Sequence, residues 1–422
     1  LSAGPGYQVK KLTVFPGRSL TNHMHHRRSE QWSIVKGQAA IVLDGERRIY
    51  GVGESVLVRP GVAHQLTNPG AEDLVLIEVS LGELAPARQD GDLQEMPQSG
   101  GDREMAADPI LRLEPVFKDN LWGGTALRDR YGKHCDYDVI AESWELSAHE
   151  AGQSLVASGP ARGMPFGEYL TRIGRGRWGW KCQAQERFPL LIKLIDARKD
   201  LSIQVHPGDE YALARENEYG KNEMWYIMDC QPDARLYCGF SQPVSKDEVA
   251  ARVKDGTLTQ VLNEVPVHKG QVVFIPAGMV HAIGAGILLC EVQQSSNVTY
   301  RLYDYGRKDR YGQLRQLHLD KALDVLDTTA RPQILEAQEN EEGHARLCAC
   351  KYFSVERQRV CGKTALAGDD ASFTALMFLE GRGTVQVEDT TLSWKSADCF
   401  FVPAGRRPIL LEGEGTLLVV RL

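Results

Sequence analysis

The chain of 422 residues is predicted to be a mainly β protein, built from three jelly-roll β-barrel units with a helical insert in the central unit. Three observations predict this fold class. Short apolar runs bounded by Gly, Pro and Asn turns fill both ends of the chain. In the middle of the chain apolar residues recur every three or four positions, which predicts helices, notably after Ser245. Ser245 is the predicted N-cap of that helix, with Glu248 three residues later. A turn built on Pro and Gly recurs in each part.

Composition divides the sequence into three units and one linker. Residues 1–84 carry strand-like runs such as EQWSIV and DLVLIEV, whereas residues 85–108 are polar and predict a linker. Residues 109–327 mix strands with helical periodicity, and residues 328–422 return to strands and turns. We therefore expect an N-terminal barrel, a central barrel with the helical insert, and a C-terminal barrel.

The recurring turn differs between the units in a way that bears on metal binding. It is RPGVAH at 59–64, IPAGMVH at 275–281 and VPAGRRP at 402–408. The first two end in a His, which a tight turn followed by a strand would point into a barrel. The third has Arg406 and Arg407 instead, so we expect the C-terminal unit to bind no metal and to support the fold.

Composition and charge exclude several classes of protein. Hydrophobic residues at 42% and charged residues at 25% are typical of a globular protein, and the net charge of −7 argues against a general nucleic-acid binder. No apolar run reaches the length of about 18 residues that a membrane span needs. The nine cysteines form no CxxC pair, so we expect free thiols and a reducing, cytoplasmic location.

Four side chains in the central unit predict a metal site. Gln204 and His206 are two residues apart on a strand-like stretch and therefore share a face, while Glu223 and His281 lie in separate strand-like runs. A single His on an apolar strand is more often a core residue than a ligand. The combination of all four residues favours a metal site instead. Imidazole, carboxylate and amide donors without a thiolate suit a divalent first-row ion, with zinc as the first expectation.

A second metal set is predicted in the N-terminal unit. His23 and His25 share a strand face, Glu30 begins the next strand, and His64 follows a tight turn. This pattern resembles the two signature motifs of the cupin superfamily. Its surroundings are similar to the isomerase domain of bifunctional type II phosphomannose isomerase/mannose-1-phosphate guanylyltransferase, and the resemblance implies these four residues as ligands. It departs from that family at His23, where Gln is usual, and the guanylyltransferase part is absent.

The central unit resembles type I mannose-6-phosphate isomerase, and the C-terminal unit resembles the last barrel of that family. The phrases that carry the resemblance are LWGG, ESWELSAH, FPLLIKLIDA, LSIQVHPGDEYA, NEMWYI, PAGMVHAIG and CEVQQSSNVTYRLYDYGR. It implies interconversion of D-mannose 6-phosphate and D-fructose 6-phosphate, with zinc held by the four central ligands. It also implies that four further side chains surround the sugar: Trp122, Lys193, Glu291 and Arg301.

The chemistry of a cis-enediol isomerisation assigns roles to these side chains. Glu291 is the first choice of base, since desolvation can raise the proton affinity of a carboxylate, and Lys193 is the second. Arg301 suits a developing enediolate or the phosphate, and Ser147 is a candidate substrate contact beside Lys193. Plain alternatives stay open: Glu291 and Lys193 as a buried ion pair, Arg301 as a brace, and Trp122 as a core residue.

The expected function is a cytoplasmic, metal-dependent mannose-6-phosphate isomerase with one dominant site in the central unit. In the N-terminal unit we expect metal binding more than turnover. The rival function is a non-catalytic cupin that senses a sugar phosphate. We expect a small sugar phosphate as partner, no nucleic acid and no membrane, and a monomer or homodimer.

Overall fold

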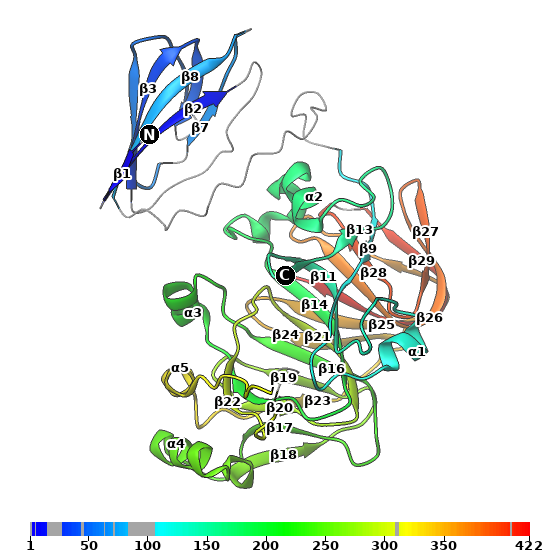
Figure 1. Cartoon of the computed structure of the whole chain (residues 1–422). Coiled ribbons are helices and arrows are strands. Elements are labelled where there is room, and N and C mark those ends of the chain that lie inside the picture. Colours follow the sequence, from blue (N-terminus) through cyan, green and yellow to red (C-terminus); the bar gives the residue numbers. More distant parts are fainter. Residues whose placement is uncertain are drawn as a thin grey trace. The chain divides into compact units, whose positions relative to one another are not determined.

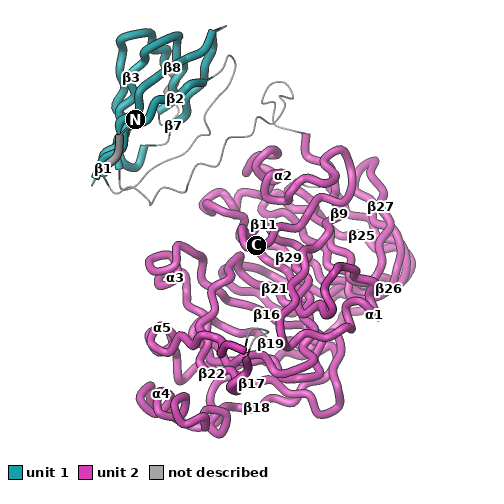
Figure 2. Tube along the Cα trace, viewed as in Figure 1, with its two compact units in different colours: residues 1–100 teal, residues 101–422 magenta. Residues whose placement is uncertain are grey.

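The computed structural model describes residues 2–4, 6–14, 28–43, 46–62, 64–70, 72–82, 106–308, 312–405 and 407–422. These residues fall into two compact units (Figure 2), which we call unit 1, residues 1–100, and unit 2, residues 101–422. Each unit is described by itself. No helix of the described residues is long and apolar enough to span a bilayer.

Unit 1 consists of two antiparallel sheets. A five-stranded sheet has the order β1-β2-β8-β3-β6 and a three-stranded sheet has the order β5-β4-β7. Along β8 every second residue is buried, as expected for a strand with one face on a core. The strands are β1 (Ser2–Gly4), β2 (Tyr7–Val14), β3 (Arg28–Lys36), β4 (Ala39–Leu43), β5 (Glu46–Tyr50), β6 (Ser55–Val58), β7 (His64–Thr67) and β8 (Leu74–Gly82).

The first part of unit 2 also has two sheets (Figure 1). The larger sheet follows the order β10 (Val116–Lys118), β11 (Glu142–His149), β14 (Leu190–Ala197), β21 (Ile287–Gln294), β16 (Glu223–Cys230), β19 (Val272–Ile275) and β23 (Gln333–Leu335), with β12 (Gly152–Gln153) on β11. The smaller sheet follows the order β18 (Leu262–Pro266), β17 (Arg235–Phe240), β20 (His281–Ile283), β15 (Ile203–Val205) and β22 (Tyr300–Tyr303). Every residue of β14 and β21 is buried, so these strands are covered on both faces.

The third sheet of unit 2 crosses the predicted domain boundary. Its order is β13 (Leu155–Val156), β9 (Leu111–Glu114), β28 (Cys399–Val402), β26 (Thr374–Val387), β29 (Ile409–Arg421), β25 (Ser354–Leu366) and β24 (His344–Ala349), with β27 (Thr390–Lys395) on β26. β9 and β13 come from the predicted central segment, and β23 of the predicted C-terminal segment joins the larger sheet. The predicted division at residue 327 stays a prediction.

Unit 2 also contains helices, and the helix predicted after Ser245 is present as α4. In α4 the Ser245 hydroxyl accepts the backbone N–H of Glu248 at 3.1 Å, the predicted N-cap. Gly256, with φ of 69°, ends this helix. The helices are α1 (Ala126–Tyr131), α2 (Phe166–Ile173), α3 (Asp209–Glu216), α4 (Lys246–Asp255), α5 (Leu319–Val325) and the 3₁₀ turns Arg175–Trp178, Trp180–Cys182 and Leu258–Val261. The prediction of a mainly β fold is confirmed.

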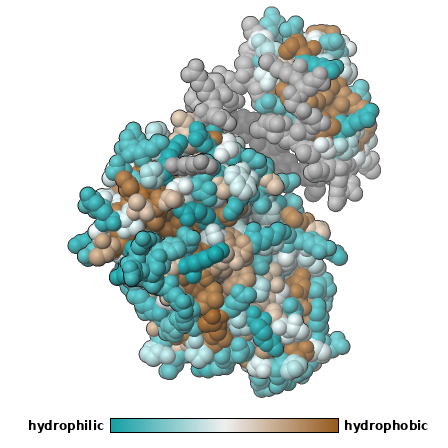
Figure 3. All heavy atoms as spheres, turned by 180° about the vertical axis from the view of Figure 1, so that it is seen from behind, coloured by the Kyte–Doolittle hydropathy of each residue, from teal (hydrophilic) through white to brown (hydrophobic). Residues whose placement is uncertain are grey.

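The surface of unit 1 carries several exposed large apolar side chains on its strands and turns. Figure 3 shows brown apolar surface on this unit, and brown patches among hydrophilic surface on unit 2. The exposed residues of unit 1 are Tyr7, Val35, Ile49, Val52, Leu57 and Leu81.

Candidate active site

One row of side chains crosses four strands of the larger sheet of unit 2. Trp144 pairs with Lys193, Lys193 with Glu291, and Glu291 with Trp225. Directly paired residues point to the same face of a sheet, so these four side chains share one face. The row brings together a cation, a carboxylate and two aromatic rings that are far apart in the sequence.

A second row crosses the smaller sheet. Gln204 pairs with Arg301 on one side and with His281 on the other. The next residue on the same face as Gln204 is His206, which follows β15 directly. Three of the four predicted metal ligands therefore come from this sheet, and the larger sheet supplies the fourth, Glu223, the first residue of β16.

The structure brings the predicted ligands together. Ligand atoms of His206, Glu223 and His281 all lie within 4.8 Å of one another. His281 Nε2 lies 3.3 Å and His206 Nε2 lies 3.8 Å from Glu223 Oε1. The Gln204 amide nitrogen lies 3.5 Å from each imidazole Nε2, and half a turn of that amide would present its oxygen instead.

Both imidazoles are held in the form that a metal needs. His206 Nδ1 lies 2.9 Å from the carbonyl of Val298, and His281 Nδ1 lies 2.8 Å from the carbonyl of Met279. A proton on Nδ1 leaves Nε2 as the free donor toward the centre of the cluster. Burial lowers the pKa of His206 well below its usual value and that of His281 to about 4, so both rings are neutral at pH 7.

The surroundings of Glu223 fit a bound cation. This carboxyl is fully buried, and among the described residues neither of its oxygens has a hydrogen-bond partner. Lys221 Nζ lies 3.0 Å from Glu223 Oε2, as an ion pair without hydrogen-bond geometry. The same ammonium lies 3.0 Å from His206 Nε2. Burial and then Glu291 raise the pKa of Glu223, because both destabilise its ionised form. A divalent cation beside this carboxylate would offset that destabilisation.

Glu291 is ionised, contrary to the expected direction of its pKa. Burial has the largest single effect and raises this pKa, but Lys193, whose Nζ lies 3.1 Å from Glu291 Oε1, lowers it together with Lys221 and the Trp225 N–H by more, so the pKa is lowered. For Lys193 itself burial lowers the pKa, while Glu291 and then Glu142 raise it by more, so the ammonium keeps its charge. The expectation of a raised proton affinity at Glu291 is wrong because two neighbouring lysines and the indole N–H together outweigh desolvation, and Lys193 is a proton donor in this state.

Trp225 lies behind Glu291 and holds it. The indole N–H donates to Glu291 Oε2 at 3.0 Å, and the indole edge meets the ring of His281, with centroids 5.5 Å apart. Trp225 is fully buried. One side chain therefore contacts both the predicted base and a predicted metal ligand.

The cavity in front of these rows has a volume of about 440 Å³, and its lysine and arginine side chains outnumber its carboxylates, which are Asp119, Glu142 and Glu291. Lys193, Arg301 and the indole of Trp122 line it, as predicted from the sequence. Arg301 donates to the Ser202 hydroxyl at 3.2 Å and to the carbonyl of Gln316 at 2.9 Å. Burial and then the neighbouring Arg315 lower the pKa of Arg301 to about 10. Further polar lining residues are Lys118, Asn120, Glu142, Lys221, Asn297, Thr299 and Arg315.

Ser147 is not brought to this cavity. Its hydroxyl donates to the carbonyl of Gly152 at 2.5 Å and accepts the N–H of His149, so it joins β11 to the β12 turn. The side chain is fully buried and does not line the cavity. Ser147 pairs with Leu191 and therefore shares the strand face of Lys193, but its hydroxyl is bonded to β12 and does not reach the cavity.

In unit 1 the structure describes two of the four predicted ligands. His64 Nε2 lies 3.6 Å from Glu30 Oε2, and both side chains are buried. His64 Nδ1 lies 2.9 Å from the carbonyl of Val62, as in the turn that carries His281. His23 and His25 lie outside the described residues. In the C-terminal barrel Arg406 also lies outside them, and the described part of that barrel contributes no metal-holding group.

The sequence argument missed Lys221 and missed the pairing of Arg28 with Glu30. Both belong to a pattern of a basic residue, Glu and Trp at alternate positions, RSEQW at 28–32 and KNEMW at 221–225. Alternation on a strand would have placed all three side chains on one face. Arg28 Nη2 lies 2.9 Å from Glu30, the counterpart of the Lys221–Glu223 pair.

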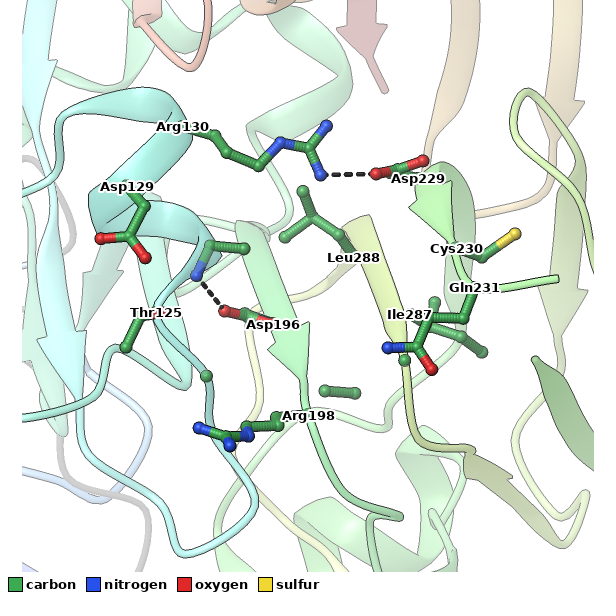
Figure 4. Close-up of a pocket in the computed structure, with 14 residues that line it drawn as sticks. Thr125, Asp129, Arg130, Asp196, Arg198, Asp229, Cys230, Gln231, Ile287 and Leu288 are labelled. Carbon is green, nitrogen blue, oxygen red and sulfur yellow. Dashed lines mark hydrogen bonds and ion pairs between the residues drawn. The ribbon is translucent and has the colours of Figure 1, made fainter. Parts of the chain in front are cut away.

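A larger cavity of unit 2, of about 490 Å³, contains none of the predicted site residues. It lies where β14, β16 and β21 meet α1 (Figure 4). Asp229 pairs with Arg130 at 2.5 Å, and Asp196 accepts the backbone N–H of Ala126 at 2.7 Å. These carboxylates are occupied by protein groups, so the cavity does not rival the two facing rows as a reaction site.

Comparison with known proteins identifies the family. Three family models match: "Mannose-6-phosphate isomerase C-terminal" at residues 1–90, "Phosphomannose isomerase type I, catalytic domain" at 110–241, and "Mannose-6-phosphate isomerase, cupin domain" at 344–422. The mannose-6-phosphate isomerase ManA of Bacillus subtilis is 39% identical over 323 residues, which are 75% of this chain and 100% of that protein. The chain belongs to the mannose-6-phosphate isomerase family.

Solved structures and a second relative agree with this assignment. The crystal structure of the mannose 6-phosphate isomerase from Bacillus subtilis matches with a TM-score of 0.70 and 35% identity, covering 75% of this chain and all of that one. The mannose-1-phosphate guanylyltransferase of Escherichia coli K12 is 45% identical over 82 residues, 19% of this chain and 17% of that protein. The cupin-like fold and both resemblances noted in the sequence are confirmed for this family member.

Proposed function

We propose that the chain interconverts D-mannose 6-phosphate and D-fructose 6-phosphate through a cis-enediol, in the cavity of about 440 Å³. The observation that carries this proposal is the pair of facing rows, with Lys193 and Glu291 on one sheet and Gln204 and His281 on the other. Moving a proton between C1 and C2 needs a base within reach of both carbons and positive groups near both oxygens. This cavity offers both.

For the metal we propose one divalent ion on Gln204, His206, Glu223 and His281, and zinc as that ion. Two neutral imidazoles, a carboxylate and an amide oxygen form a donor set that zinc accepts, and the buried Glu223 needs a cation. When bound, the ion supplies Lewis-acid polarisation of the sugar oxygens. These four side chains would hold the ion, and Gln204 connects this set to the cavity that Lys193 and Glu291 also line.

The proton transfer is assigned to Glu291. Its carboxylate takes the proton from C2 of the aldose as the C1–C2 double bond forms, and returns it to C1 of the enediol. Lys193 donates to the sugar oxygen that gains negative charge, and the planar guanidinium of Arg301 supports the same charge. Because Lys193 keeps Glu291 ionised, the base is in its working form at neutral pH.

The phosphate group is assigned to the cationic rim. After burial, the positive charge of Arg315 lowers the pKa of Arg301, and a dianionic ester would relieve this repulsion. Lys118 also lines the cavity, where its ammonium lies 4.6 Å from the ring of Trp144. This replaces the sequence-based candidate Ser147.

A second divalent ion is proposed in unit 1. The 3.6 Å separation of Glu30 and His64, both buried, supports it, and the resemblance adds His23 and His25. The prediction is that metal analysis finds two ions per chain and that His64→Ala removes one of them. An unchanged stoichiometry in that variant would contradict the second site.

The test of the function is a coupled assay that detects fructose 6-phosphate formed from mannose 6-phosphate, with and without chelator. We expect turnover that the chelator abolishes and that added zinc restores. A protein that binds mannose 6-phosphate but forms no fructose 6-phosphate under these conditions would instead be the metal-containing sensor.

A further inference from the structure

Unit 2 has a further cavity, of about 760 Å³, outside the proposed reaction site. It shares none of its lining residues with the cavity of about 440 Å³ that holds Lys193 and Glu291. Its volume lies within the range of about 300–1,000 Å³ that is usual for ligand pockets. Three aromatic rings line it, from segments far apart in the sequence: Trp180, Tyr219 and Tyr352.

Trp180 presents an exposed indole on a fixed backbone. The residue is 60% exposed although it lines a cavity. Gly179, just before it, has φ of 100°, and a Cβ at this position would overlap the backbone of Ala371. The backbone N–H of Lys181 donates to the Ala371 carbonyl at 3.0 Å, which holds the 3₁₀ turn in place. A large ring held rigidly against water is a suitable surface on which a flat ligand can stack.

The other two rings each lie beside a cation. The guanidinium carbon of Arg187 lies 5.6 Å from the centroid of the Tyr219 ring. The ammonium of Lys351 lies 5.1 Å from the centroid of the Tyr352 ring. Lys181 lines the cavity as a third cation. Aromatic faces and positive charges therefore alternate around this cavity.

The charges of the lining favour an anionic ligand. The two lining carboxylates, Glu186 and Asp209, are fewer than the three cations. Asp209 Oδ1 already accepts the backbone N–H of Gly220 and the amide N–H of Gln294, each at 2.9 Å. Among the residues that the structure describes, no carboxylate forms an ion pair with Lys351. This ammonium is therefore free to bind an external anion.

A chain of amide hydrogen bonds leads from this cavity to the predicted metal ligands. Gln294 lines the cavity, and its Oε1 accepts the side-chain N–H of Asn222 at 2.8 Å and the backbone N–H of Asn222 at 3.0 Å. Asn222 Oδ1 accepts the backbone N–H of Ala277 at 3.0 Å. Asn222 directly precedes Glu223, and Ala277 lies in the turn before His281. A ligand that moves Gln294 would therefore displace the segments that carry two of the four ligands.

We propose that this cavity is an effector site for a nucleoside phosphate, whose base stacks on Trp180 and whose phosphates bind Lys351, and that its occupancy reaches the metal ligands through Gln294 and Asn222. The effect on the reaction rests on the proposed function of unit 2, whereas the binding does not. A base supplies the flat face and a phosphate the negative charge that this lining matches. A neutral sugar would leave Lys351 without an anion, and inorganic phosphate would leave Trp180 uncovered.

Binding is tested with ADP as the probe and with adenosine and inorganic pyrophosphate as its two halves. Isothermal titration calorimetry uses the full zinc-loaded chain, freed of excess metal. We expect one ADP per chain and weaker binding of each half. Trp180→Ala and Lys351→Ala should each weaken ADP binding by about tenfold or more, because they remove the stacking surface and the phosphate contact. Both side chains are exposed, so neither change should disturb the core.

The controls are matched in kind and lie outside this cavity. Tyr137→Ala removes another exposed ring, with the residue 43% exposed, and Lys363→Ala removes a lysine whose side chain is 82% exposed. Arg315→Ala removes a cation of the reaction site. All three should bind ADP like the wild type. No ADP binding, adenosine binding as tight as ADP binding, or equal ADP affinity in Trp180→Ala would overturn the inference, and weaker binding only in Arg315→Ala would place ADP in the reaction site.

The effector role is tested by the KM for mannose 6-phosphate with and without saturating ADP. We expect a change of about fivefold or more in the wild type and none in Trp180→Ala. Competition at the reaction site and removal of zinc by ADP would both persist in Trp180→Ala, so this variant separates them from the proposed effect. In Asn222→Ala, shown to be folded by thermal unfolding, ADP should bind normally without changing KM.

The remaining outcomes separate this inference from the proposed function. Binding of ADP that leaves KM unchanged in the wild type would overturn the effector role, and an equal effect of ADP in Asn222→Ala would overturn the route through that residue. A wild-type chain that binds ADP through Trp180 and forms no fructose 6-phosphate would overturn the proposed function of unit 2 and leave the binding site standing.

Discussion

Lys193 and Glu291 are paired directly across β14 and β21, with Nζ 3.1 Å from Oε1. The pair is 5% and 3% exposed, respectively, so solvent screens it little. A buried pair of this kind could be structural, and an enzyme could also use it to keep a base ionised where the substrate binds. The metal ligands of the smaller sheet and the cavity in front of the pair favour the second account.

Replacing Glu291 by Gln should lower kcat by about 10²- to 10⁴-fold, the usual contribution of a general base. Zinc content should stay at the wild-type value, because Glu291 is not among the predicted ligands. The coupled assay and metal analysis measure both quantities on the same sample. Full activity in the variant would remove Glu291 as the base, and loss of zinc would make it part of the metal site.

Lys193→Met tests what keeps the base ionised. Burial raises the pKa of Glu291 and Lys193 lowers it, so removal of the ammonium should raise this pKa. At a given acidic pH more of the carboxyl is then protonated, and the acid limb of the kcat/KM profile should move to higher pH. Lys133→Met is the matched control, because Lys133 and Glu145 form a buried pair at 2.8 Å that does not line the cavity. An acid limb that stays in place in Lys193→Met would contradict this account.

Trp225→Phe tests the support behind Glu291. The change keeps an aromatic ring but removes the N–H that donates to Glu291 at 3.0 Å. A hydrogen bond to a charged group contributes about 1.5–3 kcal/mol, so kcat should fall by about 10- to 100-fold while KM changes little.

The control for that variant is Trp178→Phe, another buried indole, which donates to the backbone carbonyl of Leu170 at 3.3 Å away from the cavity. Both variants should lose some stability in thermal unfolding. If kcat falls equally in the two, Trp225 serves the core and not the base.

The phosphate assignment is tested by comparing Arg315→Ala with Ser147→Ala. Arg315 lines the cavity, so its removal should raise KM for mannose 6-phosphate by about tenfold, the value of one charge-assisted hydrogen bond. Ser147 bonds to the backbone of β11 and the turn after it, so its removal should lower stability by about 1 kcal/mol and leave KM unchanged. The opposite pattern would return Ser147 to the phosphate site.

Much of the site could be predicted because its signals are local. The two-residue spacing of Gln204 and His206 and the turn before His281 each follow from short stretches of sequence. The mainly β fold could be predicted for the same reason, since turns and strand periods are local.

What could not be predicted depends on pairing between distant strands. The direction of the Glu291 pKa is set by Lys193, and nothing local reveals that these residues are directly opposite each other. The exchange of β9 and β23 between sheets is likewise a long-range result of packing.

Titration of metal into the chelated protein tests the central claim most directly. One equivalent of zinc bound at residues 204, 206, 223 and 281 should restore formation of fructose 6-phosphate and raise the unfolding temperature of the chain, because the ion binds the folded state. In His281→Ala added zinc should not restore formation of fructose 6-phosphate. Recovery of full activity in His281→Ala, or in the chelated protein before metal is added, would contradict the account.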